Sequence, residues 1–157
     1  MASIAVIDAD GHITESEEQL RRYMDKEVSN RTVVGDVRAP LYPAENWNRS
    51  LGGRLGSRAG DAETWLRAMD KHGVEAAVLY PTMGLGLGRV LEPELAAAIC
   101  HAHNSFLAEE VCRVSPDRLK GVALIPVHDV ALAVKELRRA VTELGMIAAM
   151  IPSMGLA

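Results

Sequence analysis

Four apolar segments alternate with segments of helical periodicity, and this alternation constrains the fold more than any other feature of the chain. The apolar segments have the length and content of buried strands, and they are residues 3–8, 74–80, 119–125 and 146–151. The helical segments carry capping residues at their ends, and they are residues 61–72, 93–114 and 129–145. Strands that alternate with helices imply crossover connections, so the sequence predicts an α/β fold with about four parallel strands and three crossover helices.

A long stretch without clear periodicity separates the first strand from the next regular helix. Residues 16–25 are polar and predict a short helix, with Glu15 favoured as its cap. Residues 29–60 contain several glycines and prolines, which predict a long irregular insertion. Because no linker or repeat divides the remainder, residues 1–157 are predicted to form a single domain.

The last predicted helix carries its apolar residues on one side. Asp129 is suited to cap its first turn, and Gly145 to end it. The apolar residues recur every three or four positions and are predicted to form the buried face of this helix: Val130, Val134, Leu137, Val141 and Leu144.

Composition argues against several classes of function. The formal net charge is -4 and basic residues occur at most in pairs, which argues against binding to nucleic acid or to an anionic membrane. No apolar run approaches the roughly 18 residues that a membrane-spanning helix needs, and the N-terminus lacks the basic start of a signal peptide. Cys100 and Cys112 fall in one predicted helix about 18 Å apart, too far for a disulfide. The sequence therefore predicts a cytoplasmic protein.

The segment Asp8-Ala9-Asp10-Gly11-His12 carries the clearest chemical signal. In a strand, residues two apart point to the same side and lie about 6.6 Å apart along the chain. Asp10 and His12 are therefore predicted to converge at the carboxyl end of the first strand, where parallel α/β folds place active sites. A carboxylate and an imidazole suit a divalent ion such as zinc. From the spacing alone, a metal site and a hydrogen-bonded pair at a strand end are equally compatible.

The same spacing occurs twice more, at Asp70/His72 and at His101/His103. Both pairs lie on predicted helices, where residues two apart diverge by about 200° and cannot share an ion. These histidines are predicted to lie on helix surfaces or ends, and the neighbouring Asn104 receives no role.

Residues 6–15, Val-Ile-Asp-Ala-Asp-Gly-His-Ile-Thr-Glu, resemble the opening of the amidohydrolase-related family. This family includes aminocarboxymuconate-semialdehyde decarboxylase and aromatic-acid decarboxylases, and its first strand ends in His-x-His, Asp-x-His or Glu-x-His. Residues 67–82 resemble its first helix and second strand, and residues 116–126 its third strand. The resemblance covers nearly the whole chain and is weakest in residues 29–60.

The resemblance implies that the chain is the N-terminal half of a (β/α)8 TIM-type barrel, with Asp10 and His12 as the first two metal ligands. The ion would be zinc most readily, or manganese. The function implied is a metal-dependent hydrolase or decarboxylase that acts on a small carboxylate or carbonyl substrate. The family's other ligands lie on strands five, six and eight, whereas this chain ends at Ala157, and a complete barrel needs about 250 residues. The active site is thus expected to be incomplete in this chain.

Further residues are expected near the same edge of the sheet. Tyr80 and Thr82 follow the second strand and His128 follows the third, so each is a candidate for substrate contact. Asp8 is a candidate to support Asp10, with a structural role equally compatible. The glycine-rich segment Gly84–Gly88 lacks the spacing of a dinucleotide-binding loop and is interpreted as a mobile loop.

The competing hypothesis is a half-barrel fragment without catalysis. A half-barrel exposes its first and fourth strands as open edges, and open edges favour pairing with another chain. Such a chain would form a homo-oligomer or bind a second polypeptide that carries the complementing C-terminal half.

Overall fold

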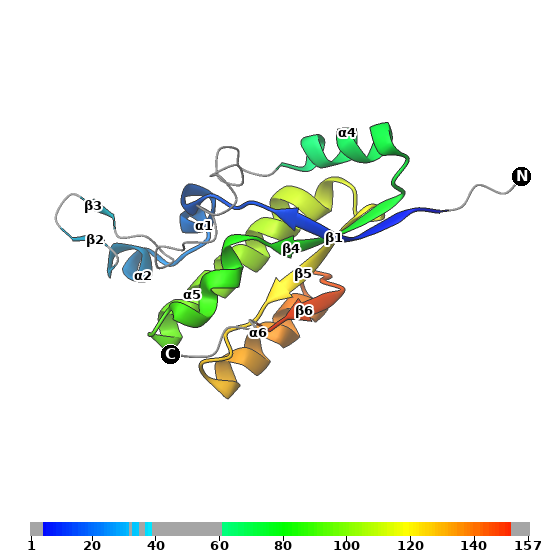
Figure 1. The fold of residues 1–157 in the computed structure, drawn as a ribbon. Helices are drawn as coiled ribbons and strands as arrows, with labels where there is room; N and C mark the ends of the chain where they lie inside the picture. Colours follow the sequence, from blue (N-terminus) through cyan, green and yellow to red (C-terminus); the bar gives the residue numbers. More distant parts are fainter. Residues whose placement is uncertain (1–4, 32, 35–36, 39–60, 152–157) are drawn as a thin grey trace, which may run out of the picture.

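A computed structural model describes residues 5–31, 33–34, 37–38 and 61–151. Within them, four strands form one sheet in the order β1-β4-β5-β6, and every neighbouring pair is parallel (Figure 1). This sheet confirms the predicted parallel α/β fold. The first strand runs through the Asp8–His12 segment to Ile13, further than the sequence pattern indicated. The four strands are β1 Ile7–Ile13, β4 Ala76–Pro81, β5 Leu119–Leu124 and β6 Ala148–Met150.

Each pair of consecutive strands in the sheet is separated along the chain by a helix, as the alternation predicted. The helices are α1 Glu17–Arg22, α2 Lys26–Arg31, α4 Ala62–His72, α5 Pro93–Phe106 and α6 Val130–Thr142. Beyond α5 the same helical path continues as a π-helical turn and then a 3-10 turn, η2 Leu107–Val111 and η3 Cys112–Val114.

The predicted irregular insertion is described only in its first part. Helix α2 reaches Arg31, and a short antiparallel pair follows, β2 Val33–Val34 and β3 Val37–Arg38. Residues 39–60 lie outside the described residues. The glycine-rich segment after β4 forms a 3-10 helix, η1 Met83–Arg89, which the sequence pattern did not indicate.

Capping residues set the limits of the helices that flank the sheet. The Asp61 carboxylate accepts a hydrogen bond of 2.7 Å from the Thr64 amide at the start of α4. Gly73 ends that helix with a left-handed φ of 68°, a conformation that glycine adopts without steric cost. Asp129 accepts in the same way from the amide of Leu132 to begin α6. The caps therefore lie where the sequence predicted them.

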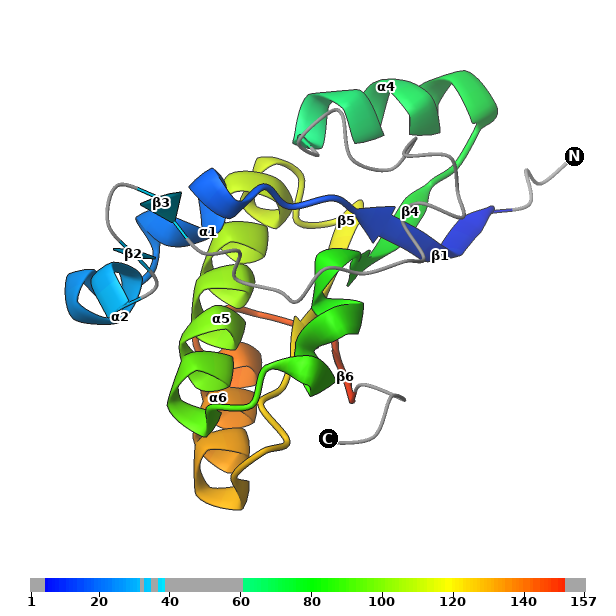
Figure 2. The ribbon, with the colours of Figure 1, turned by 60° about the vertical axis from the view of Figure 1, so that its left-hand side comes forward.

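The core lies between the sheet and the helices. Helices α5 and α6 lie side by side against one side of the sheet (Figure 2). Several large side chains in this layer are fully buried, and they include Ile13, Leu79, Ile99, Phe106, Leu107 and Leu124. None of the helices in the described part of the chain is long and apolar enough to cross a membrane.

The predicted buried face of α6 is wrong for most of its residues. Its four leading members are between 40% and 79% exposed: Val130, Val134, Leu137 and Val141. Leu144 alone of the five packs against the core. The buried residues of α6 are instead Glu136 and Ala140, one position away around the helix. The face of α6 that meets the sheet thus carries a glutamate beside the small residues Ala133 and Ala140, and periodicity does not distinguish it from the more strongly apolar face.

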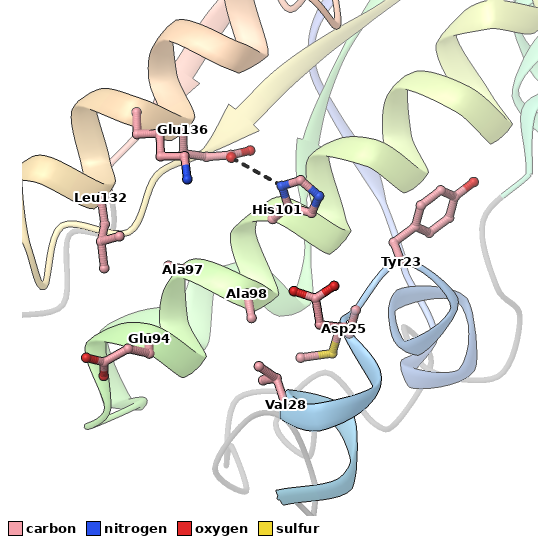
Figure 3. A pocket seen from close by; sticks show the side chains of 11 residues that line it. Tyr23, Asp25, Val28, Glu94, Ala97, Ala98, His101, Leu132 and Glu136 are labelled. Carbon is pink, nitrogen blue, oxygen red and sulfur yellow. Dashed lines mark ion pairs between the residues drawn. The ribbon is translucent and has the colours of Figure 1, made fainter.

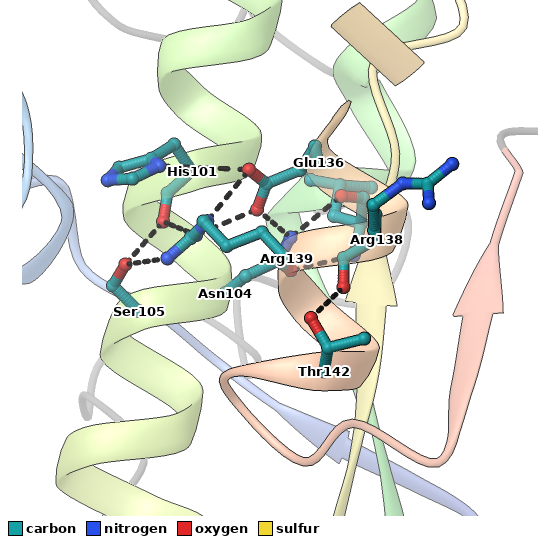
Figure 4. Close-up of polar contacts among 8 residues, drawn as sticks. His101, Asn104, Ser105, Glu136, Arg138, Arg139 and Thr142 are labelled. Carbon is teal, nitrogen blue, oxygen red and sulfur yellow. Dashed lines mark hydrogen bonds and ion pairs between the residues drawn. The ribbon is translucent and has the colours of Figure 1, made fainter. Parts of the chain in front are cut away.

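A buried polar cluster joins α5, α6 and the end of β5 (Figure 4). The Asn104 side chain donates to the Leu124 carbonyl (3.0 Å) and accepts from the Leu124 amide (2.8 Å), as a neighbouring strand would. It also donates to Glu136 Oε1 at 2.7 Å. Arg139 donates to both Glu136 oxygens and to the carbonyl of His101. Asn104 therefore ties two helices to the sheet, a role that the sequence did not indicate.

The charge of Glu136 is stabilised by this cluster. Burial by itself raises the pKa of Glu136, but hydrogen bonds from His101, Arg139 and Asn104 outweigh it and lower the pKa from 4.5 to about 2. A carboxylate whose pKa is lower in the folded state stabilises the fold above its unfolded pKa. This contribution is lost as the pH falls from 4.5 to 2.

The two cysteines are free thiols, as the sequence predicted. Cys100 is buried and Cys112 is half-buried. Burial raises the pKa of Cys100 well above its ordinary value and that of Cys112 to about 11. Both thiols are therefore protonated near neutral pH and weakly nucleophilic.

We predict that Glu136→Gln lowers the free energy of unfolding by roughly 2 kcal/mol at neutral pH, because the neutral amide loses charge-assisted hydrogen bonds. Urea unfolding followed by circular dichroism, repeated between pH 5 and pH 2, measures the effect. The decline in stability across this range should be shallower in the variant than in the wild type. Glu143→Gln, an exposed position at the end of the same helix, is the control. Equal slopes in wild type and Glu136→Gln would contradict the prediction.

Candidate metal site on strands β1 and β4

Asp10 and His12 are both exposed on β1. Gly11 and Ile13, which alternate with them, are buried. A Cβ on Gly11 would lie 2.9 Å from the Val78 carbonyl oxygen and 3.0 Å from the Trp65 ring of α4, so glycine lets α4 pack closely here. Adjacent strand residues point to opposite faces, so His12, which follows Gly11 in regular register with Tyr80, points away from α4.

The backbone of the motif is irregular just before Asp10. The register between β1 and β4 shifts between Asp8 and Gly11. Within this irregularity the Asp10 amide donates a 3.0 Å hydrogen bond to Asp8 Oδ1. Asp8 thus contacts the main chain of Asp10, and through it supports the position from which the Asp10 carboxylate projects.

The strand next to β1 supplies two side chains beside His12. Tyr80 is its register partner on β4, and the two ring centroids lie 6.0 Å apart at an interplanar angle of 33°. Thr82 follows β4, and its Oγ1 lies 3.5 Å from His12 Nδ1. The structure therefore brings Tyr80 and Thr82 to the predicted metal-ligand pair, because β1 and β4 pair in parallel and end at the same edge of the sheet.

Glu15 has a different environment from the one predicted. Its carboxylate accepts hydrogen bonds from the amides of Thr82 (3.3 Å) and Gly84 (3.0 Å), and the residue is 4% exposed. The cap of α1 is Ser16, which exchanges hydrogen bonds with Gln19 in a capping box. Sequence reasoning missed Glu15 because its partners are backbone amides 67 and 69 residues away.

His103 was predicted to lie on a helix surface or at a helix end. It lies in the last turn of α5, but it is buried. Its side chain is completely inaccessible, and its Nδ1 lies 3.6 Å from Glu15 Oε1. Burial lowers the pKa of His103 to about 3, so the ring is neutral near neutral pH. His101, two residues earlier, is half-exposed and lies 3.7 Å from Glu136. The two histidines therefore approach different carboxylates and do not share a site.

His128 lies in the turn after β5, at the same end of the sheet as His12. Both of its ring nitrogens are buried and have no hydrogen-bond partner among the described residues. A buried polar group without a partner is uncommon in folded proteins and often marks contact with a ligand, water or ion. Its predicted contact with substrate stays a prediction.

The donor set at this edge fits part of a metal site. Asp10 offers a carboxylate and His12 an imidazole, the oxygen and nitrogen ligands that zinc and manganese accept. Because Nδ1 of His12 lies beside Thr82, Nε2 is the ring nitrogen that is available to bind an ion. Among the described residues, no group of three or more histidine, cysteine or acidic side chains is placed to hold an ion. Asp10 and His12 thus supply two candidate donors, and their role as metal ligands stays a prediction.

The remaining predicted pairs and a further cavity lie elsewhere on the molecule. Asp70, on the exposed face of α4, forms an ion pair of 2.7 Å with Arg118. A cavity of about 310 Å³ lies between the α1–α2 region, α5 and α6, and its lining includes Tyr23, Asp25 and His101 (Figure 3). No residue predicted from the sequence to bind metal or substrate lines this cavity.

Known proteins resemble this chain over most of its length. The gamma-resorcylate decarboxylase of Rhodococcus jostii (strain RHA1) is 40% identical over 86 residues, which are 55% of this chain and 26% of that protein. The crystal structure of a 2,6-dihydroxybenzoate decarboxylase from Rhizobium superposes with a TM-score of 0.65 and 25% identity, over 98% of this chain and 42% of that one.

A second solved structure carries a metal. It is a dihydroxybenzoic acid decarboxylase from Polaromonas sp. JS666, with bound manganese and the inhibitor 2-nitroresorcinol. It superposes with a TM-score of 0.63 and 28% identity, over 94% of this chain and 38% of that one. The chain thus spans less than half the length of each of these three proteins.

The family described as Amidohydrolase matches residues 7–154, which include all four strands of the sheet. The solved relatives are TIM-type barrels that the chain covers in part. The chain therefore belongs to the amidohydrolase family, and its sheet corresponds to the N-terminal half of the family's (β/α)8 barrel.

Proposed function

We propose that this chain supplies the first half of the active site of a metal-dependent decarboxylase for hydroxylated aromatic acids. The observation that carries the proposal is the exposure of Asp10 and His12 on β1, with Tyr80 and Thr82 of the next strand beside His12. Similarity to three aromatic-acid decarboxylases supports decarboxylation over hydrolysis.

In this proposal Asp10 and His12 hold the divalent ion. When bound, such an ion polarises and orients a carboxylate or phenolate oxygen of the substrate. Manganese is the first metal to test, because a solved relative contains it. Zinc, which the carboxylate and imidazole donors also suit, is the second.

The neighbouring side chains suit an aromatic substrate. The Tyr80 ring, 6.0 Å from His12, offers an aromatic face against which a benzoate ring can pack. His128 has two ring nitrogens without partners among the described residues, so it can exchange hydrogen bonds with a carboxylate or hydroxyl group. Asp8 holds the Asp10 backbone through its 3.0 Å hydrogen bond.

Free, protonated thiols at Cys100 and Cys112 agree with the reducing conditions of the cytoplasm.

The remaining ligands must come from the second half of a barrel, either on the same polypeptide or on another one. A second candidate role follows from the surfaces that the half-barrel exposes. The apolar residues Val130, Val134, Leu137 and Val141 of α6 are exposed, and so are Ile147 and Ile151 beside β6, an edge strand. An apolar helix face next to an open strand edge favours association. We propose that a second copy covers this side when no complementing half is present.

We predict that the purified, tag-free chain binds Mn²⁺ through Asp10 and His12. The double substitution Asp10→Ala/His12→Ala should weaken binding by about tenfold or more, because both candidate ligands are removed. Isothermal titration and elemental analysis of the dialysed protein measure the affinity and the metal content.

The matched control is Asp70→Ala/His72→Ala, which removes the same residue types at the same spacing from α4. This control should retain wild-type affinity, since residues two apart on a helix cannot share an ion. Equal loss in both double variants, or no binding by the wild type to either Mn²⁺ or Zn²⁺, would reject Asp10 and His12 as metal ligands.

We also predict that the chain elutes as a dimer or larger oligomer. Size-exclusion chromatography with light scattering gives its mass directly. Val134→Glu/Leu137→Glu should shift the chain to a monomer, because two charges would then be buried in the contact. Ala68→Glu, an exposed position on α4, serves as the control and should leave the mass unchanged. A stable wild-type monomer would exclude self-association.

A further inference from the structure

The buried carboxylate of Glu15 is directed at the segment that follows β4. It accepts the Gly84 amide through Oε1 at 3.0 Å and the Thr82 amide through Oε2 at 3.3 Å. The Thr82 amide also donates to the carbonyl of Ile13, the last residue of β1, at 3.1 Å. The Thr82 amide therefore has two acceptors, the Ile13 carbonyl and the Glu15 carboxylate, and both lie within three residues of His12 in the sequence.

A fixed main chain fixes the Thr82 hydroxyl. Thr82 is 2% exposed, and the χ1 angle of a β-branched side chain has few alternatives. Its Oγ1 lies 3.5 Å from His12 Nδ1. This distance is at the upper limit of a hydrogen bond, and such contacts commonly shorten when a site is assembled with its ligand.

The identity of the ring nitrogen that carries the proton matters for ligation. A neutral histidine binds a metal through the nitrogen that has a free lone pair, and the N–H of its other nitrogen usually donates a hydrogen bond to a nearby acceptor. If Nδ1 carries the proton and donates a hydrogen bond to Thr82 Oγ1, the Nε2 lone pair of His12 is free. Thr82 thus has the position and the chemistry to select the tautomer that a ligand requires.

Burying a carboxylate is costly, which makes the position of Glu15 informative. An ionised carboxylate away from water needs hydrogen bonds to compensate for lost solvation. Two main-chain amides donate to Glu15, while the His103 ring, whose Nδ1 lies 3.6 Å from Oε1, is neutral. The arrangement holds the segment Thr82–Gly84 against the end of β1.

We propose that Glu15 and Thr82 form a relay that positions His12 for metal binding. Glu15 holds the Thr82 main chain, and Thr82 Oγ1 accepts a hydrogen bond from Nδ1–H of His12, so that the Nε2 lone pair faces the ion. Both are positioning residues: they act through His12 and do not bind the metal themselves. This inference rests on the proposed function, since it assigns His12 as a ligand.

The test compares the His12 tautomer and the Mn²⁺ affinity in one set of variants of the 157-residue chain. Nitrogen-15 NMR of the imidazole distinguishes Nδ1–H from Nε2–H, and Mn²⁺ broadens signals of nuclei near its binding site. Thr82→Val removes the hydroxyl with little change of shape, and Thr82→Ser retains it. Glu15→Gln places an amide group against main-chain N–H donors, and Glu18→Gln, exposed on α1, is its control.

We expect the Nδ1–H tautomer in the wild type, Thr82→Ser and Glu18→Gln. Thr82→Val should shift the ring toward Nε2–H and weaken Mn²⁺ binding about tenfold, the effect typical of losing a hydrogen-bond partner of a ligand. Glu15→Gln should act in the same direction, and because it removes a buried group its folding is checked by circular dichroism.

Two outcomes separate this inference from the function on which it rests. An unchanged tautomer and unchanged Mn²⁺ affinity in Thr82→Val would overturn the relay, whether or not Glu15→Gln folds. Absence of Mn²⁺ broadening at His12 in the wild type would instead overturn the proposed metal site. In that case the tautomer in Thr82→Val would still decide whether Thr82 orients the ring.

Discussion

The parallel pairing of β1 with β4 is the interaction on which the rest of the structure depends. It aligns His12 with Tyr80 and brings Thr82 within 3.5 Å of the His12 ring. Gly11 makes the pairing compatible with a covering helix, because any larger residue would meet the β4 backbone and Trp65. Strand β1 then exposes Asp10 and His12 at the carboxyl edge of the sheet, where barrel enzymes place their chemistry.

Buried polar side chains connect this sheet to its surroundings in two places by the same physical means. Glu15 accepts the amides of Thr82 and Gly84, while Asn104 pairs with both main-chain groups of Leu124. In each case a side chain supplies the hydrogen bonds that main-chain groups at a strand end require away from water. The first link holds the candidate site, and the second anchors α5 and, through Glu136, α6.

The surface of the half-barrel reflects the same architecture. In a closed barrel every strand has two neighbours and every helix is flanked on both sides, whereas β1 and β6 are edges of the sheet that the described residues form. The face of α6 that meets the sheet carries a glutamate and small residues, while the more strongly apolar face is exposed at Val134 and Leu137. Association with a complementing half or a second copy would bury that face.

The sequence by itself determined the parallel α/β fold and the helix caps at Asp61 and Asp129, because these depend on local periodicity and spacing. The role of Asp10 and His12 as metal ligands stays a prediction, because spacing alone is equally compatible with a hydrogen-bonded pair. The position of Tyr80 and Thr82 near His12 was also predictable from the sequence, because neighbouring parallel strands end at the same edge of the sheet. The buried face of α6, and the partners of Glu15, His103 and Asn104, were decided only by the tertiary structure. Helical periodicity shows that a face is apolar but not what it packs against, and hydrogen bonds between residues 20 to 69 positions apart leave no local pattern in the sequence.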